Sequence, residues 1–341
     1  MQSLNKKNDL QPLRSLTVIG SGSWATALVK IFSENAINVK WYLRSQEYVD
    51  FVMANRRNPN YLSFLQLDLQ YIQPTSIIED ALSSSSDIVF AVPSAFLEST
   101  TAQLDMELLR DKQIYVSIKG LVSDQLLIPS VFLQKKFNLK RDNIYSLAGP
   151  CHAEEIAMDR KTYLTISGKD KKGTDRIAAA IKSHYLHVIT NADPLGIEYA
   201  AIIKNVIGIA CGIAKGLNYG DNFLAVVVSN AMREVKDFLL KVDEQERDLF
   251  DSAYFGDLLV TAYSKFSRNR NFGYMIGRGY SVIKAETRMT MVTEGFPAVK
   301  GLNETAKLLG VKMPVLSTVY RILYHHSSPF TEFKLLESQL K

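Results

Sequence analysis

The sequence predicts an α/β protein: a Rossmann-type domain with a mostly parallel sheet, followed by an all-α domain. Three observations lead to this fold class. The chain has 341 residues, more than one hydrophobic core usually organises. Short β-rich runs alternate with helical patterns as far as Asn191, which is typical of a parallel sheet. From Asp193 onward helical periodicity dominates, so we place the domains at 14–191 and 192–341.

The first strand and helix carry a dinucleotide-binding fingerprint. The apolar run Leu16–Ile19 predicts a strand, and Thr26–Phe32 predicts the helix that follows. Gly20, Gly22 and Ala25 stand between them in the spacing G-x-G-x-x-A. The first glycine permits a tight turn, the second lets the backbone approach a pyrophosphate, and the alanine allows close packing. The helix N-terminus then offers N–H groups to the phosphates.

The second strand bears on the choice of coenzyme. It is predicted at Val39–Leu43 and is followed by Arg44. An acidic residue here binds the ribose 2′-OH of NAD, whereas an arginine accommodates a 2′-phosphate. Arg44 therefore favours NADP, or tolerance of both coenzymes, unless it is an ordinary solvated arginine.

The remaining strands place further polar residues at their carboxyl ends, where α/β sheets bind ligands. They are predicted at Gln70–Gln73, Ile88–Val92, Ile114–Ile118, Ile144–Leu147, Tyr163–Ile166 and His187–Thr190. Lys119 follows the fifth strand, where it faces an anionic substrate or the nicotinamide unless it is a solvated loop lysine. His152 lies in the loop after the sixth strand; it could act as an acid or base, but a lone loop histidine is more often structural, and we expect that here.

The second domain opens with an apolar helix that carries a lysine. Asp193 can cap this helix, and Pro194 fits its first turn. The turns around Lys204 are apolar nearly all round, which marks a buried helix. A buried lysine is rare unless it is paired or deprotonated. The alternatives are a lysine that reaches the helix edge or one held in a structural ion pair.

Two further groups of polar residues lie in the helical half. Asp257 and Thr261 stand one turn apart on one helix face, where they could bind a polyol or orient a catalytic lysine. Ser267, Arg268 and Asn269 open another helical stretch, and an arginine fork with backbone N–H groups grips phosphate. For each group the alternative is a solvated helix cap.

The amino-acid composition argues against several kinds of binding partner. The chain is 47% hydrophobic and 22% charged, as globular proteins are, and its net charge of +5 comes from scattered basic residues. It contains no nucleic-acid module, so we expect no nucleic-acid partner. Cys151 and Cys211 form neither a disulfide framework nor a metal spacing, so we expect no metal and a cytoplasmic location. Met1–Asp9 lacks the apolar core of a secretory signal, and we expect no membrane span.

The order of these motifs resembles that of NAD(P)-dependent sn-glycerol-3-phosphate dehydrogenases of the bacterial type. The matching segments are Ile19–Trp24, Ala91–Ser94, Lys119–Leu121, Ala148–Pro150, Lys204–Val206, Gly256–Leu258, Ser267–Arg270 and Val292–Gly295. The resemblance implies reversible hydride transfer between NAD(P)H and dihydroxyacetone phosphate, giving sn-glycerol 3-phosphate for glycerophospholipid synthesis. It also implies a homodimer.

The resemblance assigns roles to individual residues. It implies that Lys204 is the catalytic acid/base, that Lys119 assists it, and that Asp257 lies in the glycerol pocket. The cofactor-binding residues it implies are Gly20, Gly22, Ser23, Trp24, Arg44, Lys119, Ala153, Arg268 and Glu294. The substrate-binding residues it implies are Lys119, Gly149, Cys151, Lys204, Asn205, Asp257, Thr261, Ser267, Arg268 and Asn269. Cys151 and His152 replace the Thr-Phe pair that is usual in the family.

Two other functions are compatible with parts of the pattern. One is a two-domain dehydrogenase acting on a hydroxyacid or a phosphorylated sugar acid, against which the segment Ser267–Arg270 argues. The other is a catalytically idle relative that binds the dinucleotide as a sensor or scaffold. The presence of Lys204, Lys119 and Asp257 together argues against it.

Overall fold

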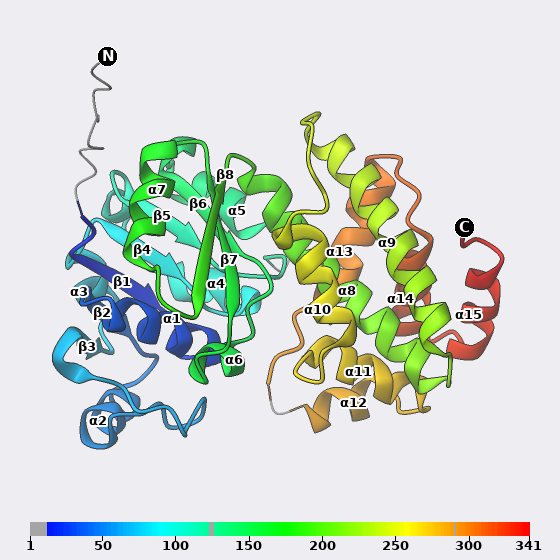
Figure 1. The fold of residues 1–341 in the computed structure, drawn as a ribbon, viewed down its shortest axis with the longest axis horizontal. Helices are drawn as coiled ribbons and strands as arrows, with labels where there is room; N and C mark the ends of the chain where they lie inside the picture. The colour runs from blue at the N-terminus through cyan, green and yellow to red at the C-terminus, as the bar shows by residue number, and fades with distance from the viewer. Residues whose placement is uncertain (1–11, 123–125, 290) are drawn as a thin grey trace, which may run out of the picture.

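The computed structural model describes residues 12–122, 126–289 and 291–341. A sheet domain, blue to green in Figure 1, adjoins a domain of helices that runs from green to red. The predicted α/β fold with a helical second half is therefore confirmed. The segment Met1–Asp9, for which we expect no secretory signal, lies outside the described residues.

Within the described residues, eight strands form one sheet in the order β3-β2-β1-β4-β5-β6-β7-β8. The strands are β1 (Ser15–Ile19), β2 (Asn38–Tyr42), β3 (Ile72–Thr75), β4 (Asp87–Phe90), β5 (Gln113–Val116), β6 (Ile144–Ala148), β7 (Thr162–Gly168) and β8 (Leu186–Asn191). β6 and β7 pair antiparallel, and the other neighbours pair parallel. The strand order reverses between β1 and β4, and such a reversal opens a binding crevice at the carboxyl ends of the strands.

One predicted strand is displaced. We expected the third strand at Gln70–Gln73, whereas β3 spans Ile72–Thr75. Leu69–Tyr71 instead forms a 3₁₀ turn, η1, because the Asp68 side chain accepts a hydrogen bond from the Gln70 N–H at 3.0 Å. An aspartate that bonds the backbone two residues on favours a turn over an extended strand.

Helices cover both faces of the sheet, as a parallel sheet requires. Val18 and Trp41 pack in one apolar layer with α1, α6 and α7, whereas Ile19 and Phe90 pack in the other with α3, α4 and α5. The helices are α1 (Ser23–Glu34), α2 (Gln46–Asn55), α3 (Ile78–Ser83), α4 (Ser94–Thr101), α5 (Pro129–Phe137), α6 (Ala153–Ala157) and α7 (Lys171–Ala180).

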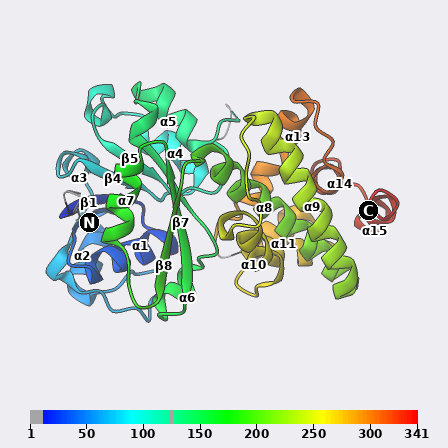
Figure 2. The same ribbon diagram turned by 45° about the horizontal axis from the view of Figure 1, so that its top comes forward.

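The helix α8 (Pro194–Gly216) is the centre of the second domain, and most of the other helices pack against it (Figures 1 and 2). The Asp193 side chain caps it by accepting from the Gly196 N–H at 3.0 Å, as expected. By length and composition α8 could cross a membrane, but nearly all of it is buried inside the protein, as in a core helix. The others are α9 (Asp221–Val242), α10 (Asp257–Tyr263), α11 (Arg268–Gly277), α12 (Val282–Arg288), α13 (Gly295–Leu308), α14 (Pro314–Tyr324) and α15 (Pro329–Glu337).

Short turns complete the chain, and one of them matters for the site. The turns are η1 (Leu69–Tyr71), η2 (Met106–Leu109), η3 (Arg141–Asn143) and the π-helix η4 (Ser252–Gly256). The π-helix runs directly into α10, whose first residue is Asp257. Single π turns inside helical segments are frequent at functional sites.

Glycines allow α11 to lie directly against α8. A Cβ on Gly212 of α8 would lie 2.1 Å from the Arg270 carbonyl oxygen, and one on Gly273 of α11 would lie 2.1 Å from the Ile209 carbonyl oxygen. Both approaches are too close for any other residue. This contact fixes α11 on the helix that carries Lys204.

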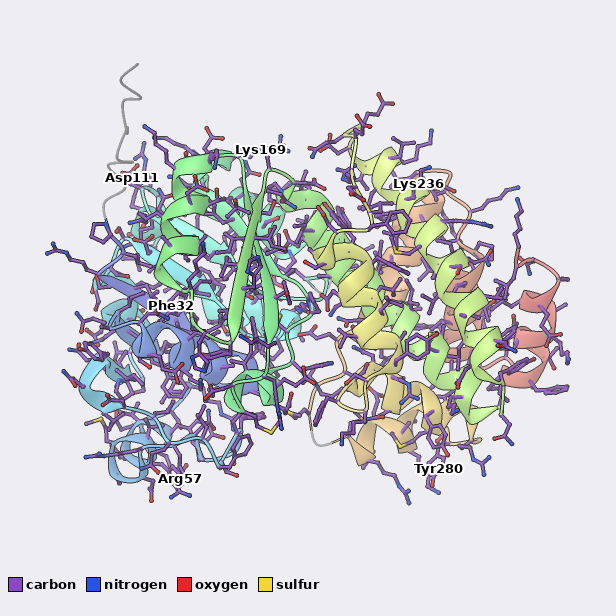
Figure 3. All side chains as sticks on the ribbon, in the orientation of Figure 1. Phe32, Arg57, Asp111, Lys169, Lys236 and Tyr280 are labelled. Carbon is purple, nitrogen blue, oxygen red and sulfur yellow. The ribbon has the colours of Figure 1, made fainter. Side chains whose placement is uncertain are left out.

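The side chains in Figure 3 distinguish the interior from the periphery. Phe32 of α1 is fully buried beneath the sheet, whereas Arg57, Asp111, Lys169 and Lys236 are exposed on the outer surface.

Candidate active site

A cavity between the two domains collects most of the predicted site residues. They come from strand ends in the sheet domain and from four helical segments of the second domain. The predicted residues that line it are Gly22, Ser23, Trp24, Lys119, Cys151, Ala153, Lys204, Asn205, Asp257, Thr261, Ser267, Arg268, Asn269 and Glu294. Segments more than 250 positions apart in the chain therefore meet at one place.

Three predicted residues do not line this cavity. Gly20 has φ +141°, and a Cβ there would lie 2.6 Å from the Ala91 carbonyl oxygen, so the tight turn requires glycine. Gly149 has φ +131°, and a Cβ there would lie 2.8 Å from the Tyr163 carbonyl oxygen of β7. Arg44 is exposed beyond the end of β2, with its guanidinium 4.5 Å from the centre of the Tyr48 ring.

The glycine turn leaves room for a phosphate group. Gly22 is the N-cap of α1, no side chain caps the helix there, and a Cβ on Gly22 would meet no atom within 4 Å. The first N–H groups of α1 have no partner within the helix, and Ser23 and Trp24 line the cavity. The Asn58 side chain holds the turn by donating to the Ser21 carbonyl oxygen at 3.0 Å. The turn thus fits a dinucleotide pyrophosphate.

Two lysines share one buried carboxylate. Lys204 Nζ donates to Asp257 Oδ1 at 2.5 Å, and Lys119 Nζ lies 3.6 Å from Asp257 Oδ2. Lys204 is 7% exposed and Asp257 is 1% exposed, so neither is a solvated surface group. Lys119 Nζ also lies 3.8 Å from Cys151 Sγ, and Asn205 Nδ2 donates to the Lys119 carbonyl oxygen at 2.8 Å.

This arrangement shifts the pKa values of the two lysines in opposite directions. Burial lowers the pKa of Lys204 to about 8; the Asp257 charge opposes this shift, and the Lys119 charge reinforces it. Burial also acts to lower the pKa of Lys119, but the Asp257 charge opposes this shift, and the pKa of Lys119 is raised. Burial raises the pKa of the Cys151 thiol, which therefore stays neutral. Lys204 is the lysine able to exchange a proton near neutral pH.

The Glu294 side chain, at the start of the helical domain's α13, binds Ser94 of the sheet domain. Its Oε1 accepts from the Ser94 N–H at 3.0 Å, and its Oε2 accepts from the Ser94 hydroxyl at 2.5 Å. Burial raises the pKa of Glu294. The next residue, Gly295, donates its N–H to Asn269 Oδ1 at 2.9 Å. Glu294 and Gly295 together therefore connect the start of α13 to the strand end after β4 and to the start of α11.

The start of α11 has the form expected from the sequence. Ser267 caps the helix by accepting from the Arg270 N–H at 3.3 Å, and Arg268 is its first residue. Arg268 Nη1 donates to the Val292 carbonyl oxygen at 3.3 Å. The Thr261 hydroxyl donates to the Asp257 carbonyl oxygen at 2.7 Å, so these two residues do lie one turn apart.

Several residues of the site were not expected from the sequence. The Ser117 hydroxyl accepts a hydrogen bond from Trp24 Nε1 at 2.7 Å, and the Ser94 hydroxyl donates to Glu294. Both serines lie just after a strand, and this position could have marked them as site residues. Tyr61 and Phe266 also line the cavity, but no local pattern marks them. His152, which we expected to be structural, is also among the residues that line the cavity.

Comparison with known families gives a consistent result over most of the chain. The family model described as the N-terminus of NAD-dependent glycerol-3-phosphate dehydrogenase matches residues 15–174. The model described as the C-terminus of the same family matches residues 193–334.

Individual relatives cover nearly the same span. A Clostridium botulinum protein (strain Eklund 17B) named glycerol-3-phosphate dehydrogenase (NAD(P)+) is 32% identical, over 93% of this chain and 95% of its own. A Lactobacillus delbrueckii subsp. bulgaricus protein named glycerol-3-phosphate dehydrogenase (NAD(P)+) 2 is 35% identical to this chain. The match covers 90% of this chain and 92% of the relative. The crystal structure of glycerol-3-phosphate dehydrogenase from Coxiella burnetii has the same fold, with a TM-score of 0.88 at 24% identity, covering 95% of this chain and 99% of that one.

Proposed function

The chain belongs to the NAD-dependent glycerol-3-phosphate dehydrogenase family, and from this premise we propose which of its residues carry out the reaction. It is an oxidoreductase that uses NAD or NADP, and its reaction is the reversible reduction of dihydroxyacetone phosphate to sn-glycerol 3-phosphate. The observation that carries the proposal is the buried group of Lys204, Asp257 and Lys119, in the same cavity as the dinucleotide turn and Arg268.

The coenzyme fits along the edge formed by β1, β2 and β4. Gly22, Ser23 and Trp24 would hold the pyrophosphate on the tight turn that Gly20 permits, and Arg44, exposed after β2, would lie at the adenosine end. Ala153, Arg268, Lys119 and Glu294 also line the cavity, and in this proposal they border the nicotinamide. When bound, the reduced nicotinamide supplies a hydride to the carbonyl carbon of the substrate.

Lys204 moves the proton that accompanies this hydride. As an ammonium it donates a proton to the substrate oxygen during reduction, and as a neutral amine it accepts the hydroxyl proton during oxidation. A pKa of about 8 makes both forms available near neutral pH, which general acid–base catalysis requires. Asp257 holds the ammonium in place, and the Lys119 charge favours negative charge on the substrate oxygen.

The rest of the cavity binds the substrate. Arg268 and the N-terminus of α11 hold the phosphate, because a guanidinium fork and backbone N–H groups together match its oxygens. Ser267 and Asn269 flank Arg268, and Thr261 lies beside Asp257. Cys151 and Asn205 complete the substrate pocket, and Gly149, which was also expected to bind substrate, acts on it through Cys151, whose thiol donates to the Gly149 carbonyl oxygen at 3.0 Å.

The wider organisation follows from the same premise. We place the domains at 14–191 and 192–341, supported by the end of β8 at Asn191 and the start of α8 at Pro194. The family resemblance supports a homodimer that supplies sn-glycerol 3-phosphate for phospholipid synthesis; light scattering of the purified protein tests the assembly state. Cys151 and Cys211 are both free thiols, which supports a reducing, cytoplasmic compartment.

A comparison of substrates tests the function. Oxidation of NADH and NADPH is followed with dihydroxyacetone phosphate, unphosphorylated dihydroxyacetone and hydroxypyruvate in parallel. We expect kcat/KM for dihydroxyacetone phosphate to exceed that for either of the others by at least about 10²-fold, because the phosphate-binding groups would be left without a partner. Preference for hydroxypyruvate would identify a hydroxyacid dehydrogenase. Coenzyme binding without turnover of any substrate would identify a non-catalytic binding protein.

A further inference from the structure

A buried polar group of three side chains lies outside the cavity and takes no part in the mechanism above. Asp193 and Tyr254 are buried, and the Arg247 side chain is only 5% exposed. Arg247 Nε donates to Asp193 Oδ2 at 2.6 Å, and Arg247 Nη2 donates to Oδ1 at 3.2 Å. The Tyr254 hydroxyl donates to Oδ2 at 2.6 Å, and the Gly196 N–H donates to Oδ1 at 3.0 Å. One carboxylate therefore joins three separate segments of the chain.

These hydrogen bonds keep the group in one charge state. Burial acts to raise the pKa of Asp193, but the hydrogen bonds from Arg247 and Tyr254 oppose this shift, and the pKa is lowered. Burial and the bond to Asp193 both raise the pKa of Tyr254, so the phenol stays neutral. A buried network whose members are satisfied holds the elements that it joins in one arrangement.

The start of α8 is built around this group. A Cβ on Gly196 would lie 1.9 Å from Asp193 Oδ2 and 2.7 Å from Arg247 Nε, so any other residue there would displace the pair. Because Asp193 caps α8, the pair fixes the beginning of the helix on which Lys204 lies about three turns further along.

Tyr254 connects the same carboxylate to the segment that carries Asp257. It lies inside the π-helix η4, which packs against α8. The Asp257 N–H donates to the carbonyl oxygens of Ser252 and Tyr254, and the bond to Ser252 closes the π turn. An α-helical turn would close on Ala253 instead and would turn the Asp257 side chain to a different angle about the helix axis. The π turn therefore determines where the Asp257 carboxylate points.

We propose that Tyr254 is a positioning residue, which holds the π turn on Asp193 so that the Asp257 carboxylate meets Lys204. The path to the site is short, because Tyr254 lies three residues before Asp257, whose Oδ1 accepts from Lys204 Nζ at 2.5 Å. Tyr254 itself lies outside the lining of the cavity. This inference rests on the proposed function, since its kinetic readout is the pH dependence of that reaction.

Tyr254→Phe keeps the buried ring and removes only the hydroxyl. We expect it to displace the Asp257 carboxylate and to leave the other groups around Lys204 in place. The titratable and charged groups that face Lys204 are Asp257 from α10, Lys119 from the end of β5, and Cys151 and His152 from the loop after β6. Because the Asp257 charge stabilises the ammonium, the Lys204 pKa should fall in this variant.

The pH profile of sn-glycerol 3-phosphate oxidation measures this shift. The break in kcat/KM should move to lower pH by at least about half a unit. We expect kcat to fall about tenfold, as misplacement of a group in the site costs rate, with the coenzyme KM within about twofold of wild type.

Tyr185→Phe is the matched control for loss of a buried phenol–carboxylate hydrogen bond. Tyr185 is buried just before β8, and its hydroxyl donates to Glu34 Oε2 at 2.7 Å. This variant should lower the melting temperature to a similar extent and leave the break in place. If Tyr254→Phe also lowers only the melting temperature, Tyr254 is merely structural and the proposal is wrong.

A double-mutant cycle shows whether Tyr254 acts through Asp257. In an enzyme that carries Asp257→Asn, adding Tyr254→Phe should leave the break in place and change kcat by no more than about twofold, because the carboxylate that it positions is already absent. Losses that add independently would overturn the proposal.

A crystal structure of Tyr254→Phe tests the geometry without turnover. We expect the Asp257 carboxylate to be displaced from Lys204, and an unchanged contact between them would contradict the positioning role. A displaced carboxylate in a protein that does not reduce dihydroxyacetone phosphate would refute the proposed function and leave the positioning role standing. An active enzyme in which the break stays in place would refute the positioning role and leave the function standing.

Discussion

The acid–base role proposed for Lys204 depends on two neighbours that shift its pKa in opposite directions. Burial and the Lys119 charge favour the neutral amine, whereas Asp257 favours the ammonium. The ordinary lysine pKa of 10.5 would leave almost no neutral amine at pH 7, so oxidation of the alcohol would lack a base. A pKa of about 8 serves both directions of the reaction.

The Asp257 charge can be tested through the pH dependence of oxidation. Because oxidation requires the neutral amine, kcat/KM for sn-glycerol 3-phosphate should rise with pH and level off above about 8 in the wild type. Asp257→Asn removes the charge that stabilises the ammonium, so the Lys204 pKa should fall and the break should move to lower pH. A profile measured from pH 6 to 10 checks this. A break that stays in place or moves upward contradicts the assigned role of Asp257.

Arg44 is the residue through which coenzyme preference is tested. It stands in the exposed position after β2, where a 2′-phosphate would lie. Arg44→Asp removes a partner of that phosphate and adds an acceptor for the ribose hydroxyl, so the kcat/KM ratio of NADPH to NADH should fall. Steady-state kinetics with both coenzymes measures the ratio. An unchanged ratio would make Arg44 an ordinary surface residue.

At the scale of the elements, the site depends on how closely α11 lies against α8. Gly212 on α8 and Gly273 on α11 each face backbone of the other helix. Ser267, Arg268 and Asn269 at the start of α11 line the cavity, so a displacement of this helix would move the proposed phosphate site.

Gly212→Ala should therefore impair both stability and substrate binding. A methyl group there would overlap the Arg270 carbonyl oxygen, so α11 must shift away from α8. Over-packing of this kind typically costs about 1–3 kcal/mol, and KM for dihydroxyacetone phosphate should rise more than the coenzyme KM. Chemical denaturation and steady-state kinetics measure the two effects. Gly220→Ala, where a Cβ would meet nothing within 4 Å, is the matched control; equal behaviour of the two variants would contradict the packing argument.

Local patterns were sufficient to predict most elements but not the irregular ones. The strands and the start of α8 follow from apolar runs and from the Asp193–Pro194 cap. The strand β3 was displaced by the local hydrogen bond of Asp68. The π-helix before Asp257 could not be predicted, because it depends on tertiary contacts such as the hydrogen bond from the Tyr254 hydroxyl to Asp193 Oδ2 at 2.6 Å.

At the scale of the whole molecule, a buried carboxylate links the two domains near the site. Glu198 of α8 accepts from the Ser130 N–H of α5 at 2.9 Å and is 3% exposed. Burial raises the pKa of Glu198 to about 7, despite the hydrogen bonds with Ser130. Stability of the joined domains therefore depends on pH through this group.

Glu198→Gln tests this link. In the unfolded chain Glu198 has an ordinary pKa near 4.5, so between about pH 4.5 and 7 the folded state binds a proton that the unfolded state releases. The contribution of Glu198 to stability is thus fully present below pH 4.5 and declines as pH rises through 7. The free energy of unfolding of wild type minus that of Glu198→Gln should fall by about 2–3 kcal/mol from pH 4.5 to 8. Urea denaturation at both pH values measures it; a constant or rising difference contradicts the argument.

The residues that line the cavity were easier to predict than the contacts that they make with one another. The order of motifs implied that Gly22, Lys119, Lys204 and Arg268 belong to one site, and the structure brings them together. That Lys204 and Lys119 share Asp257 depends on how α8, α10 and the end of β5 pack. The place of His152 depends likewise on domain packing, which no local spacing encodes.

The central claim is that Lys204 transfers the proton during reduction of dihydroxyacetone phosphate. Lys204→Ala is compared with wild type by measuring kcat for NADPH oxidation, with coenzyme affinity and melting temperature as controls. We expect kcat to fall by about 10²–10⁴-fold, the usual contribution of a positioned acid or base, while coenzyme affinity changes little. A folded variant that binds the coenzyme normally and retains more than about a tenth of the wild-type kcat would show that another group supplies the proton.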